Sequence, residues 1–310
     1  MKKKLGMAVS ALVLAACMGP FSAASSLASI TEMELELDAN GHLRVPVGVG
    51  DAGTFDFILD TAASRTGVMQ PLVQELNWQP REGERVIANG IAGATEIDMY
   101  AAQDLAIGNE LVYRSQELPG MGDLTIPGDP FYGILGSDFF ENYVVEIDAP
   151  GELIRFSETE ASSLIGSAAN DFSSAEISEI PEMGIWQLQV MIGEMPVTAL
   201  LDTGARGSLM NRAAAEALGV DLPPPPAPGE GEDISGAAGH HQQGIGLQIG
   251  EISVGTRTWE NVQLLVSDVH VFDVIGLGDV PAMILGSDLL FDGRLVVDYA
   301  DGRVYIENAE

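Results

Sequence analysis

The chain has 310 residues, a formal net charge of −32 and one cysteine, with 46 Asp and Glu against 14 Lys and Arg. This charge excludes recognition of nucleic acid through its phosphates, which bind to positive surfaces. A single cysteine excludes a disulfide within the chain, so packing must stabilise the fold, and this length is sufficient for one or two hydrophobic cores.

The first 24 residues have the pattern of a secretory signal. The lysines Lys2–Lys4 precede the apolar stretch Leu5–Ala16, which is too short to span a bilayer as a helix. We therefore assign residues 1–24 to a signal and lipobox segment outside the fold, and we expect an exported, periplasmic protein.

The end of this segment allows two kinds of processing. Leu14-Ala15-Ala16-Cys17 resembles a bacterial lipobox, in which lipidation of Cys17 would anchor the protein at the outer membrane. The alternative is cleavage after Ala24, with Cys17 as a filler residue of the apolar stretch. No later segment has transmembrane length, so we expect membrane contact only through such a lipid.

Alternating apolar and polar residues dominate the rest of the chain and predict an all-β fold. Opening strands are expected at residues 43–49 and 186–192, each followed by a glycine-containing turn and a second strand. Short helices are expected at residues 71–76 and 212–218, and Asn211 precedes the second helix as a candidate N-cap.

Two copies of one unit make up this part of the chain. In each copy an apolar run ends in Asp-Thr and a small residue, Ile-Leu-Gly-Ser-Asp follows downstream, and an apolar strand containing an Asp comes last. The first copy carries these motifs at residues 57–64, 134–140 and 144–148, and the second carries them at residues 199–206, 284–290 and 295–299. The repeat predicts that two carboxylates meet at a pseudo-two-fold axis.

The repeat divides the chain into two lobes. We expect an N-terminal lobe at residues 30–157 and a C-terminal lobe at residues 181–310. Residues 158–180 between them are rich in Ser, Ala and Glu, have no counterpart in the repeat and are interpreted as a linker.

The motifs resemble those of the aspartic proteases. Each half is similar to a retroviral-type, retropepsin-like aspartyl protease domain, and two such halves in one chain resemble the two-lobed arrangement of pepsin. The resemblance implies an all-β, two-lobed acid protease fold, in which each lobe is a small β-barrel-like domain with one or two short helices. Gly204 fits the family motif, whereas Ala62 stands where the family usually has glycine.

The Asp of each motif is the candidate catalytic residue. Two carboxyl groups held close together share one proton, and such a pair can activate a water molecule and protonate a leaving amine. We assign this role to Asp60 and Asp202. Thr61 and Thr203 are supporting residues, which the resemblance implies lock the two loops together across the lobe interface. Ala62 and Gly204 are supporting residues that leave room for water and substrate.

Glycine-rich hairpin tips occur at matching positions in both halves. The resemblance implies that they are flaps that fold over a bound peptide, although glycine-rich tips are also typical of plain hairpin turns. The candidate substrate-binding residues are Gly90, Ile91, Gly93, Gly236, Ala237 and Gly239.

Other polar residues predict no further chemistry. Asp138 and Asp288 are expected to cap helices or bond loops, as are the strand-end aspartates Asp148 and Asp298. The adjacent histidines at 240–241 would point apart on a strand, and no cofactor motif appears, so we expect neither metal nor cofactor.

Together these features predict an exported aspartic endopeptidase that acts on a peptide or protein substrate. One alternative is a catalytically weak or inactive retropepsin-like protein that binds peptides or serves a structural role. Another is a dimer in which each half pairs with a half of a second chain. The linker and the divergence between the halves favour a monomer with pairing inside the chain. The acidic surface either has no role in recognition or favours cationic peptides.

Overall fold

The computed structural model describes residues 30–38, 41–91, 93–101, 103–108, 110–121, 130–227, 229–236 and 241–309. The signal and lipobox segment 1–24, Cys17, Ala237 and Gly239 lie outside these residues, so the interpretations of them remain predictions. Among the helices of the described ranges, none is long and apolar enough to cross a membrane.

The N-terminal half is built almost entirely of strands. In β3, for example, every second residue is apolar and fully buried on the core side, namely Leu43, Val45, Val47 and Val49. Its elements are β1 (Ile30–Glu34), β2 (Glu36–Leu37), β3 (Leu43–Val49), β4 (Thr54–Leu59), β5 (Gly67–Val68), α1 (Gln70–Glu75), β6 (Pro80–Gly90), β7 (Gly93–Ala101), β8 (Leu105–Ile107), β9 (Leu111–Tyr113), β10 (Glu117–Pro119), β11 (Gly133–Leu135), α2 (Ser137–Phe140), β12 (Val144–Asp148) and β13 (Leu153–Ser157).

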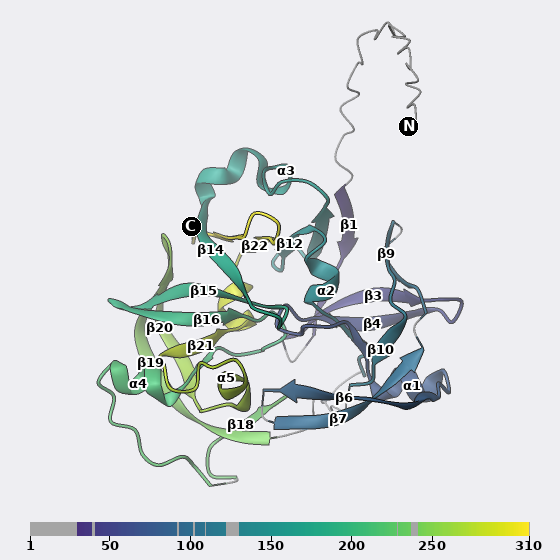
Figure 1. Cartoon of the computed structure of the whole chain (residues 1–310). Coiled ribbons are helices and arrows are strands. Elements are labelled where there is room, and N and C mark those ends of the chain that lie inside the picture. Colours follow the sequence, from purple (N-terminus) through teal and green to yellow (C-terminus); the bar gives the residue numbers. More distant parts are fainter. Residues whose placement is uncertain are drawn as a thin grey trace, which may run out of the picture.

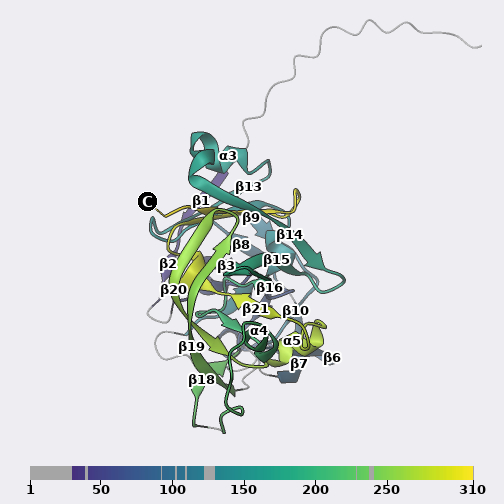
Figure 2. The same ribbon diagram turned by 90° about the vertical axis from the view of Figure 1, so that its left-hand side faces the viewer.

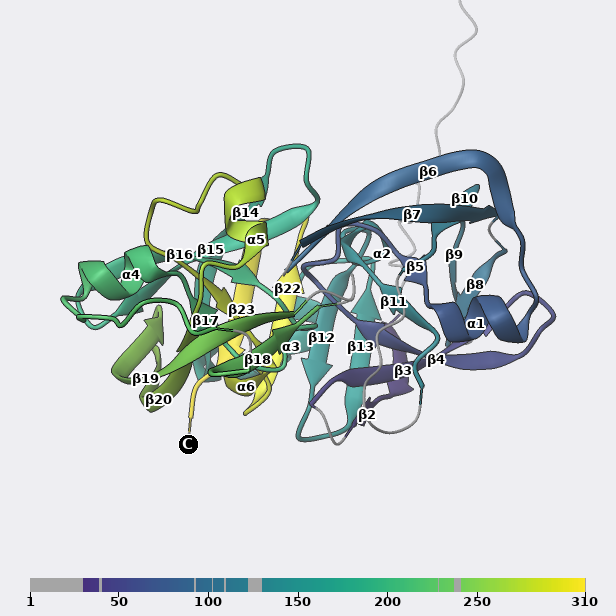
Figure 3. The same ribbon diagram turned by 90° about the horizontal axis from the view of Figure 1, so that it is seen from below.

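The C-terminal half repeats this order with longer central strands. Its elements, with η1 as a 3-10 helix, are α3 (Ser162–Ile165), η1 (Gly166–Asp171), β14 (Phe172–Ile180), β15 (Ile185–Ile192), β16 (Met195–Leu201), β17 (Leu209–Met210), α4 (Arg212–Ala217), β18 (Glu232–Ser235), β19 (His241–Val254), β20 (Arg257–Val266), α5 (His270–Val274), β21 (Ala282–Leu285), α6 (Ser287–Leu290), β22 (Arg294–Asp298) and β23 (Arg303–Glu307). Figure 3 shows the two halves side by side.

A sheet with strand order β1-β13-β12-β22-β23-β14 joins the halves. Its central pair, β12 and β22, is antiparallel and in symmetric register, since Val144 pairs with Asp298 and Asp148 with Arg294. The buried Glu146 lies at its centre and accepts hydrogen bonds from Arg155 at 2.9 Å and from Arg294, in the other half, at 3.2 Å. Figure 1 shows β12, β22 and β14 together on one side of the molecule, and Figure 2 labels β1, β13 and β14 of the same sheet in a view turned by 90°. The all-β, two-lobed architecture predicted from the sequence is confirmed.

The expected linker is shorter than predicted. Residues 172–180 form β14, which pairs with β23 as β1 pairs with β13 and then continues into pairing with β15. The assignment of this stretch to a linker is therefore wrong. The serines and glutamates of this stretch suggested a solvated linker. Ser173 instead is buried and donates a hydrogen bond to the Val254 carbonyl at 2.7 Å, as a residue of a packed strand does.

The short elements agree closely with expectation. The strand expected at 43–49 is β3, and the strand expected at 186–192 is β15. The two predicted helices are α1, which lies one residue earlier than predicted, and α4, which begins at the predicted residue and ends one residue earlier. Asn211 caps α4, since its side chain accepts a hydrogen bond from the Ala214 backbone at 2.9 Å. The elements that carry the repeated motifs are thus the ones that the pattern predicted.

Candidate active site

Each candidate aspartate lies at the end of a buried strand. Asp60 follows β4 and Asp202 follows β16, and each strand runs parallel to the Ile-Leu-Gly strand of its own half. The Asp60 amide donates to the Leu135 carbonyl at 3.0 Å, and the Asp202 amide donates to the Leu285 carbonyl at 3.1 Å. The apolar strands therefore lie beneath the site, and the polar Asp-Thr pair follows directly where each of these strands ends.

The glycine of each Ile-Leu-Gly motif permits this close packing. A Cβ built on Gly136 would lie 2.7 Å from the Ala63 carbonyl oxygen, and one on Gly286 would lie 2.9 Å from the Ala205 carbonyl oxygen. Any side chain at these positions would push an Asp loop away from its supporting strand. The Ile-Leu-Gly motifs therefore pack directly beneath the Asp loops.

The loops direct backbone amides at the carboxyl groups. Asp60 Oδ1 accepts from the amides of Ala62 and Ala63, both at 2.9 Å. Asp202 Oδ1 accepts from the amides of Gly204 at 2.9 Å and Ala205 at 2.8 Å. Each carboxyl group also acts on the pKa of its counterpart, so the two groups lie close together. The two halves therefore bring their aspartates together.

The threonines lock the two loops to each other. Thr61 Oγ1 donates to the Leu201 carbonyl at 2.7 Å and accepts from the Thr203 amide at 3.0 Å. Thr203 Oγ1 does the converse, donating to the Leu59 carbonyl and accepting from the Thr61 amide, both at 3.1 Å. All four bonds are buried and cross between the halves. The arrangement holds the two aspartates at a fixed separation.

Burial makes ionisation of both aspartates costly. Burial raises the pKa of Asp60, while backbone hydrogen bonds and the hydrogen bond from Asp202 offset part of the shift. Burial and the nearby charge of Asp60 raise the pKa of Asp202 well above its usual range. The pair therefore holds one proton between its two carboxyl groups where a lone aspartate would be ionised.

The two flap candidates reach each other. β6 and β7 form a hairpin in which Gly90 pairs with Gly93, and β18 and β19 form the corresponding hairpin of the C-terminal half. Ile91 at the first tip contacts Gly236 at the second, where a Cβ would collide with the Ile91 side chain. Ile91 also packs against an apolar cluster of the C-terminal half that includes Leu200 and Ile284. Figure 3 shows β6 and β7 extending towards α5.

The aspartates of Ile-Leu-Gly-Ser-Asp bond a neighbouring loop and do not cap a helix. Asp138 Oδ1 accepts from the Thr66 amide at 2.8 Å and hydroxyl at 2.7 Å, and Asp288 Oδ1 accepts from the Ser208 amide at 2.9 Å and hydroxyl at 2.6 Å. Since Thr66 and Ser208 end the Asp loops, these carboxylates fix the loops from below. The helix-capping alternative is not what the structure shows.

Sequence reasoning missed a second pair of contacts between the halves. Ser137 Oγ donates to the Gly184 carbonyl at 2.5 Å, and Ser287 Oγ donates to the Gly41 carbonyl at 3.3 Å. Each serine belongs to one half and each glycine to the other. The signal that could have indicated them was the serine shared by both copies of Ile-Leu-Gly-Ser-Asp.

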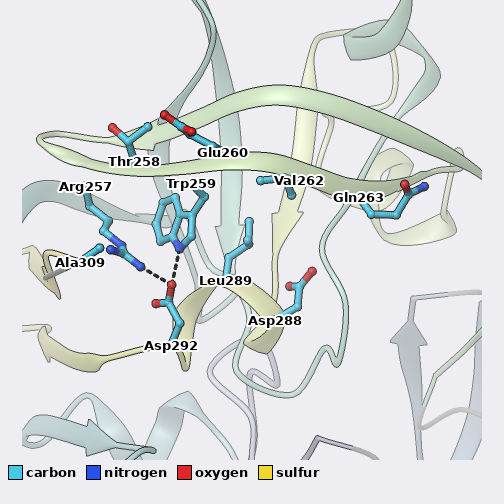
Figure 4. Close-up of a pocket in the computed structure, with 10 residues that line it drawn as sticks. All are labelled: Arg257, Thr258, Trp259, Glu260, Val262, Gln263, Asp288, Leu289, Asp292 and Ala309. Atoms are coloured by element: carbon cyan, nitrogen blue, oxygen red, sulfur yellow. Dashed lines mark hydrogen bonds and ion pairs between the residues drawn. The ribbon is translucent and has the colours of Figure 1, made fainter.

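A surface cavity of about 470 Å³ lies between β20 and α6. Figure 4 shows Arg257 and Trp259 directed at Asp292, with Asp288 at the opposite side. Neither Asp60 nor Asp202 lines it. In the described ranges of the chain, no three His, Cys, Asp or Glu side chains are grouped as a metal site would require.

Comparison with known proteins agrees with this geometry. A profile of the family described as Aspartyl protease matches residues 45–139 and 188–289, so the chain belongs to this family, and both halves carry the match. The solved structure of the aspartic proteinase from Irpex lacteus is similar with a TM-score of 0.54 and 13% identity, over 91% of this chain and 98% of that one. At this identity the likeness concerns the fold. A search of curated sequences gives no match. Family and fold together support a protease-type function.

Proposed function

We propose that the protein is an aspartic endopeptidase that hydrolyses peptide bonds through Asp60 and Asp202. The observation that carries the proposal is the meeting of two buried carboxyl groups, one from each half, on loops that reciprocal threonine hydrogen bonds join. Buried carboxyl groups paired in this way share a proton, which is the protonation state that hydrolysis by an activated water needs. A merely structural loop would gain nothing from two adjoining acids whose pKa values are both raised.

The two groups take distinct roles in the proposed reaction. The ionised member of the pair takes a proton from a water molecule lying between the carboxyl groups, and this water attacks the peptide carbonyl carbon. The protonated member donates a hydrogen bond to the carbonyl oxygen as negative charge develops there. The first carboxyl group then passes the proton that it took from the water to the leaving amine as the C–N bond breaks. The backbone amides of residues 62, 63, 204 and 205 hold both carboxyl groups in place.

Asparagine substitution tests the proposal. Asp60→Asn and Asp202→Asn should each abolish cleavage of a mixed peptide library, assayed from pH 3 to 7 with and without pepstatin, while the fold remains intact. Wild-type activity should fall on the alkaline side, where the second carboxyl group ionises. Asp51→Asn, in the exposed β3–β4 turn, is the matched control. Near-normal turnover in either dyad variant would contradict the assignment.

Two further properties belong to the proposal. The intrachain pairing of β12 with β22 and the intrachain threonine bonds support a monomer, in preference to half-sites shared between two chains. The signal-like segment 1–24 supports export to the periplasm, with lipidation at Cys17. Cys17→Ser should release the protein into a soluble fraction or block its processing, and a mature N-terminus at Ser25 would contradict lipidation.

A further inference from the structure

Arg206 differs from most other cations of this chain. Lys2–Lys4 account for three of the 14 basic residues, and the rest are arginines that all lie in the described ranges. Most of them form an ion pair or a side-chain hydrogen bond, namely Arg44, Arg81, Arg85, Arg114, Arg155, Arg212, Arg257, Arg294 and Arg303. Among the arginines that the structure describes, Arg65 and Arg206 alone have neither kind of contact. In a chain with such an excess of acidic residues, an unpaired guanidinium on the Asp202 loop is available to bind an anionic ligand.

The stem of Arg206 is fixed at the junction of the two halves. A Cβ built on Gly41 of the N-terminal half would lie 3.0 Å from Arg206 Cγ, so the stem rests on that glycine. The Arg206 carbonyl accepts from Ser287 Oγ at 3.2 Å, and the same hydroxyl donates to the Gly41 carbonyl. Arg206 as a whole is nevertheless exposed. The backbone and stem are held while the guanidinium stays accessible.

Arg206 lies beside the candidate active site, with an apolar cluster on each side of it. Its neighbour Ala205 packs against the same apolar cluster as the flap residue Ile91. On the other side its charge acts on His42, whose ring centroid lies 6.5 Å from that of Phe131. Phe131 belongs to the apolar cluster beside the Asp60 loop. Arg206 therefore lies between the clusters that flank the two Asp loops.

Arg65 is placed differently although it is also unpaired. Its charge acts on Tyr113, whose hydroxyl donates to Asp138 at 2.7 Å. It therefore lies on the side of the Asp60 loop that faces α2 and β9. The position in the N-terminal half that corresponds to Arg206 is Ser64, since each follows its aspartate by four residues. Each Asp loop thus carries one guanidinium, but the two lie at different positions of the loop.

We infer that Arg206 determines specificity by binding a carboxylate of the substrate, the side chain of a Glu or Asp on one side of the scissile bond. The inference rests on the proposed function and names its substrate class. Four residues of chain span at most about 14 Å, and an extended peptide advances by about 3.3 Å per residue. The acidic residue therefore lies about two to four positions from the scissile bond. A guanidinium binds a carboxylate through paired N–H donors, so Asp or Glu is preferred to other anions.

The test compares peptides that differ by one charge. One cleaved peptide is made with Glu, Gln or Lys at each position up to four residues on either side of the scissile bond, and kcat/KM is measured. Wild-type protein should prefer Glu to Gln about fivefold at one such position, as expected for an exposed ion pair. Arg206→Met should lose the preference, and Arg206→Glu should prefer Lys. The control Arg114→Met removes an equally exposed charge that is paired with Asp104 and should keep it.

Two conditions separate charge recognition from a structural effect of the substitution. The preference should vanish below about pH 4, where the substrate Glu is protonated, and should shrink at high ionic strength. Wild-type protein without a Glu preference at any position, a Glu preference that survives in Arg206→Met, or a general preference for Lys would each overturn the inference.

A binding experiment distinguishes failure of this inference from failure of the proposed function. The same peptides, labelled for fluorescence anisotropy, are titrated into Asp202→Asn and into Asp202→Asn with Arg206→Met. If no peptide is cleaved by the wild type, the endopeptidase proposal fails. In that case a Glu preference in binding that depends on Arg206 still supports the inference, whereas equal affinity of both proteins for the Glu and Gln peptides overturns it.

Discussion

Gly204 lies directly against the carboxyl group of Asp60. A Cβ built on Gly204 would be 2.6 Å from Asp60 Oδ2 and 2.8 Å from Oδ1, closer than real Cβ atoms come to such neighbours. Gly204 does not have a positive φ, so contact with the opposite aspartate, and not backbone conformation, demands glycine there. The Asp loop of the C-terminal half is thus shaped to fit the carboxyl group of Asp60 in the other half.

This contact predicts that Gly204→Ala, which adds a methyl group, and Ala62→Gly, which removes one at the matching position, have unequal effects. Gly204→Ala should reduce kcat by 100-fold or more, because the methyl group displaces Asp60 and small displacements of reacting groups cost about this much. Ala62→Gly should keep or raise kcat and cost about 1 kcal/mol of stability or less, since glycine gives the unfolded chain more freedom. Turnover and melting temperature of both variants provide the measurement. A Gly204→Ala protein that is unchanged in both would place residue 204 outside a crowded site.

The buried threonine bonds predict a loss of stability that depends on the hydroxyl group. Thr203→Val keeps the shape but leaves the Leu59 carbonyl and the Thr61 amide without partners. Each unsatisfied buried group costs about 1–3 kcal/mol, so the free energy of unfolding should fall by about 2–5 kcal/mol. Thr203→Ser keeps the hydroxyl group and is the control. Urea unfolding compares them, and equal stability of the Val and Ser variants would contradict the role of the bonds.

Sequence pattern predicted the elements that carry the motifs, because strand alternation and the repeat are local signals. It failed at β14, where the buried Ser173 behaves as a core residue through a hydrogen bond that no pattern reveals. It also missed the steric reason for Gly204, since that reason depends on where Asp60 lies in the other half. The same limit applies to Ser137 and Arg206. Contacts across the pseudo-two-fold axis become visible only when the two halves are assembled.

The raised pKa of Asp202 predicts how stability changes with pH. Between the unfolded pKa of about 3.9 and the higher folded pKa, the native state binds more protons than the unfolded state, so the free energy of unfolding falls as pH rises. Asp202→Asn removes this contribution. The variant should therefore gain stability relative to wild type from pH 4 to 8, by about 1.4 kcal/mol for each unit of raised pKa.

Urea unfolding at pH 4, 6 and 8 measures this difference, with Asp51→Asn as the control for loss of one exposed charge. If the difference between Asp202→Asn and wild type stays constant with pH, or changes in the opposite direction, the native pair of Asp60 and Asp202 does not hold a proton over this pH range.

The contact between the tips of the β6–β7 and β18–β19 hairpins predicts energetic coupling of Ile91 and Gly236. Gly236→Ala places a methyl group where the Ile91 side chain lies, so it should displace Ile91 and speed hydrogen exchange at the tip of β6 and β7. In an Ile91→Ala background the same substitution should have little effect, because the colliding atoms are absent. Hydrogen exchange of the four proteins gives the coupling directly. Additive effects would show that the tips do not meet in solution.

The serine contacts between the halves predict an asymmetry in stability. Ser137 Oγ makes one hydrogen bond of 2.5 Å to the Gly184 carbonyl, whereas Ser287 Oγ divides longer bonds of 3.3 and 3.2 Å between the carbonyls of Gly41 and Arg206. Hydrogen bonds weaken as they lengthen, and a typical one contributes about 0.5–1.5 kcal/mol net. Ser137→Ala should therefore cost about 1 kcal/mol, and Ser287→Ala less. The two sites lie on opposite sides of the pseudo-two-fold axis, so their effects on urea unfolding should add.

Both substitutions should also lower kcat, because each serine begins the helix that follows the glycine packed beneath an Asp loop. A larger loss of stability in Ser287→Ala than in Ser137→Ala would show that these bond lengths do not rank the two contacts.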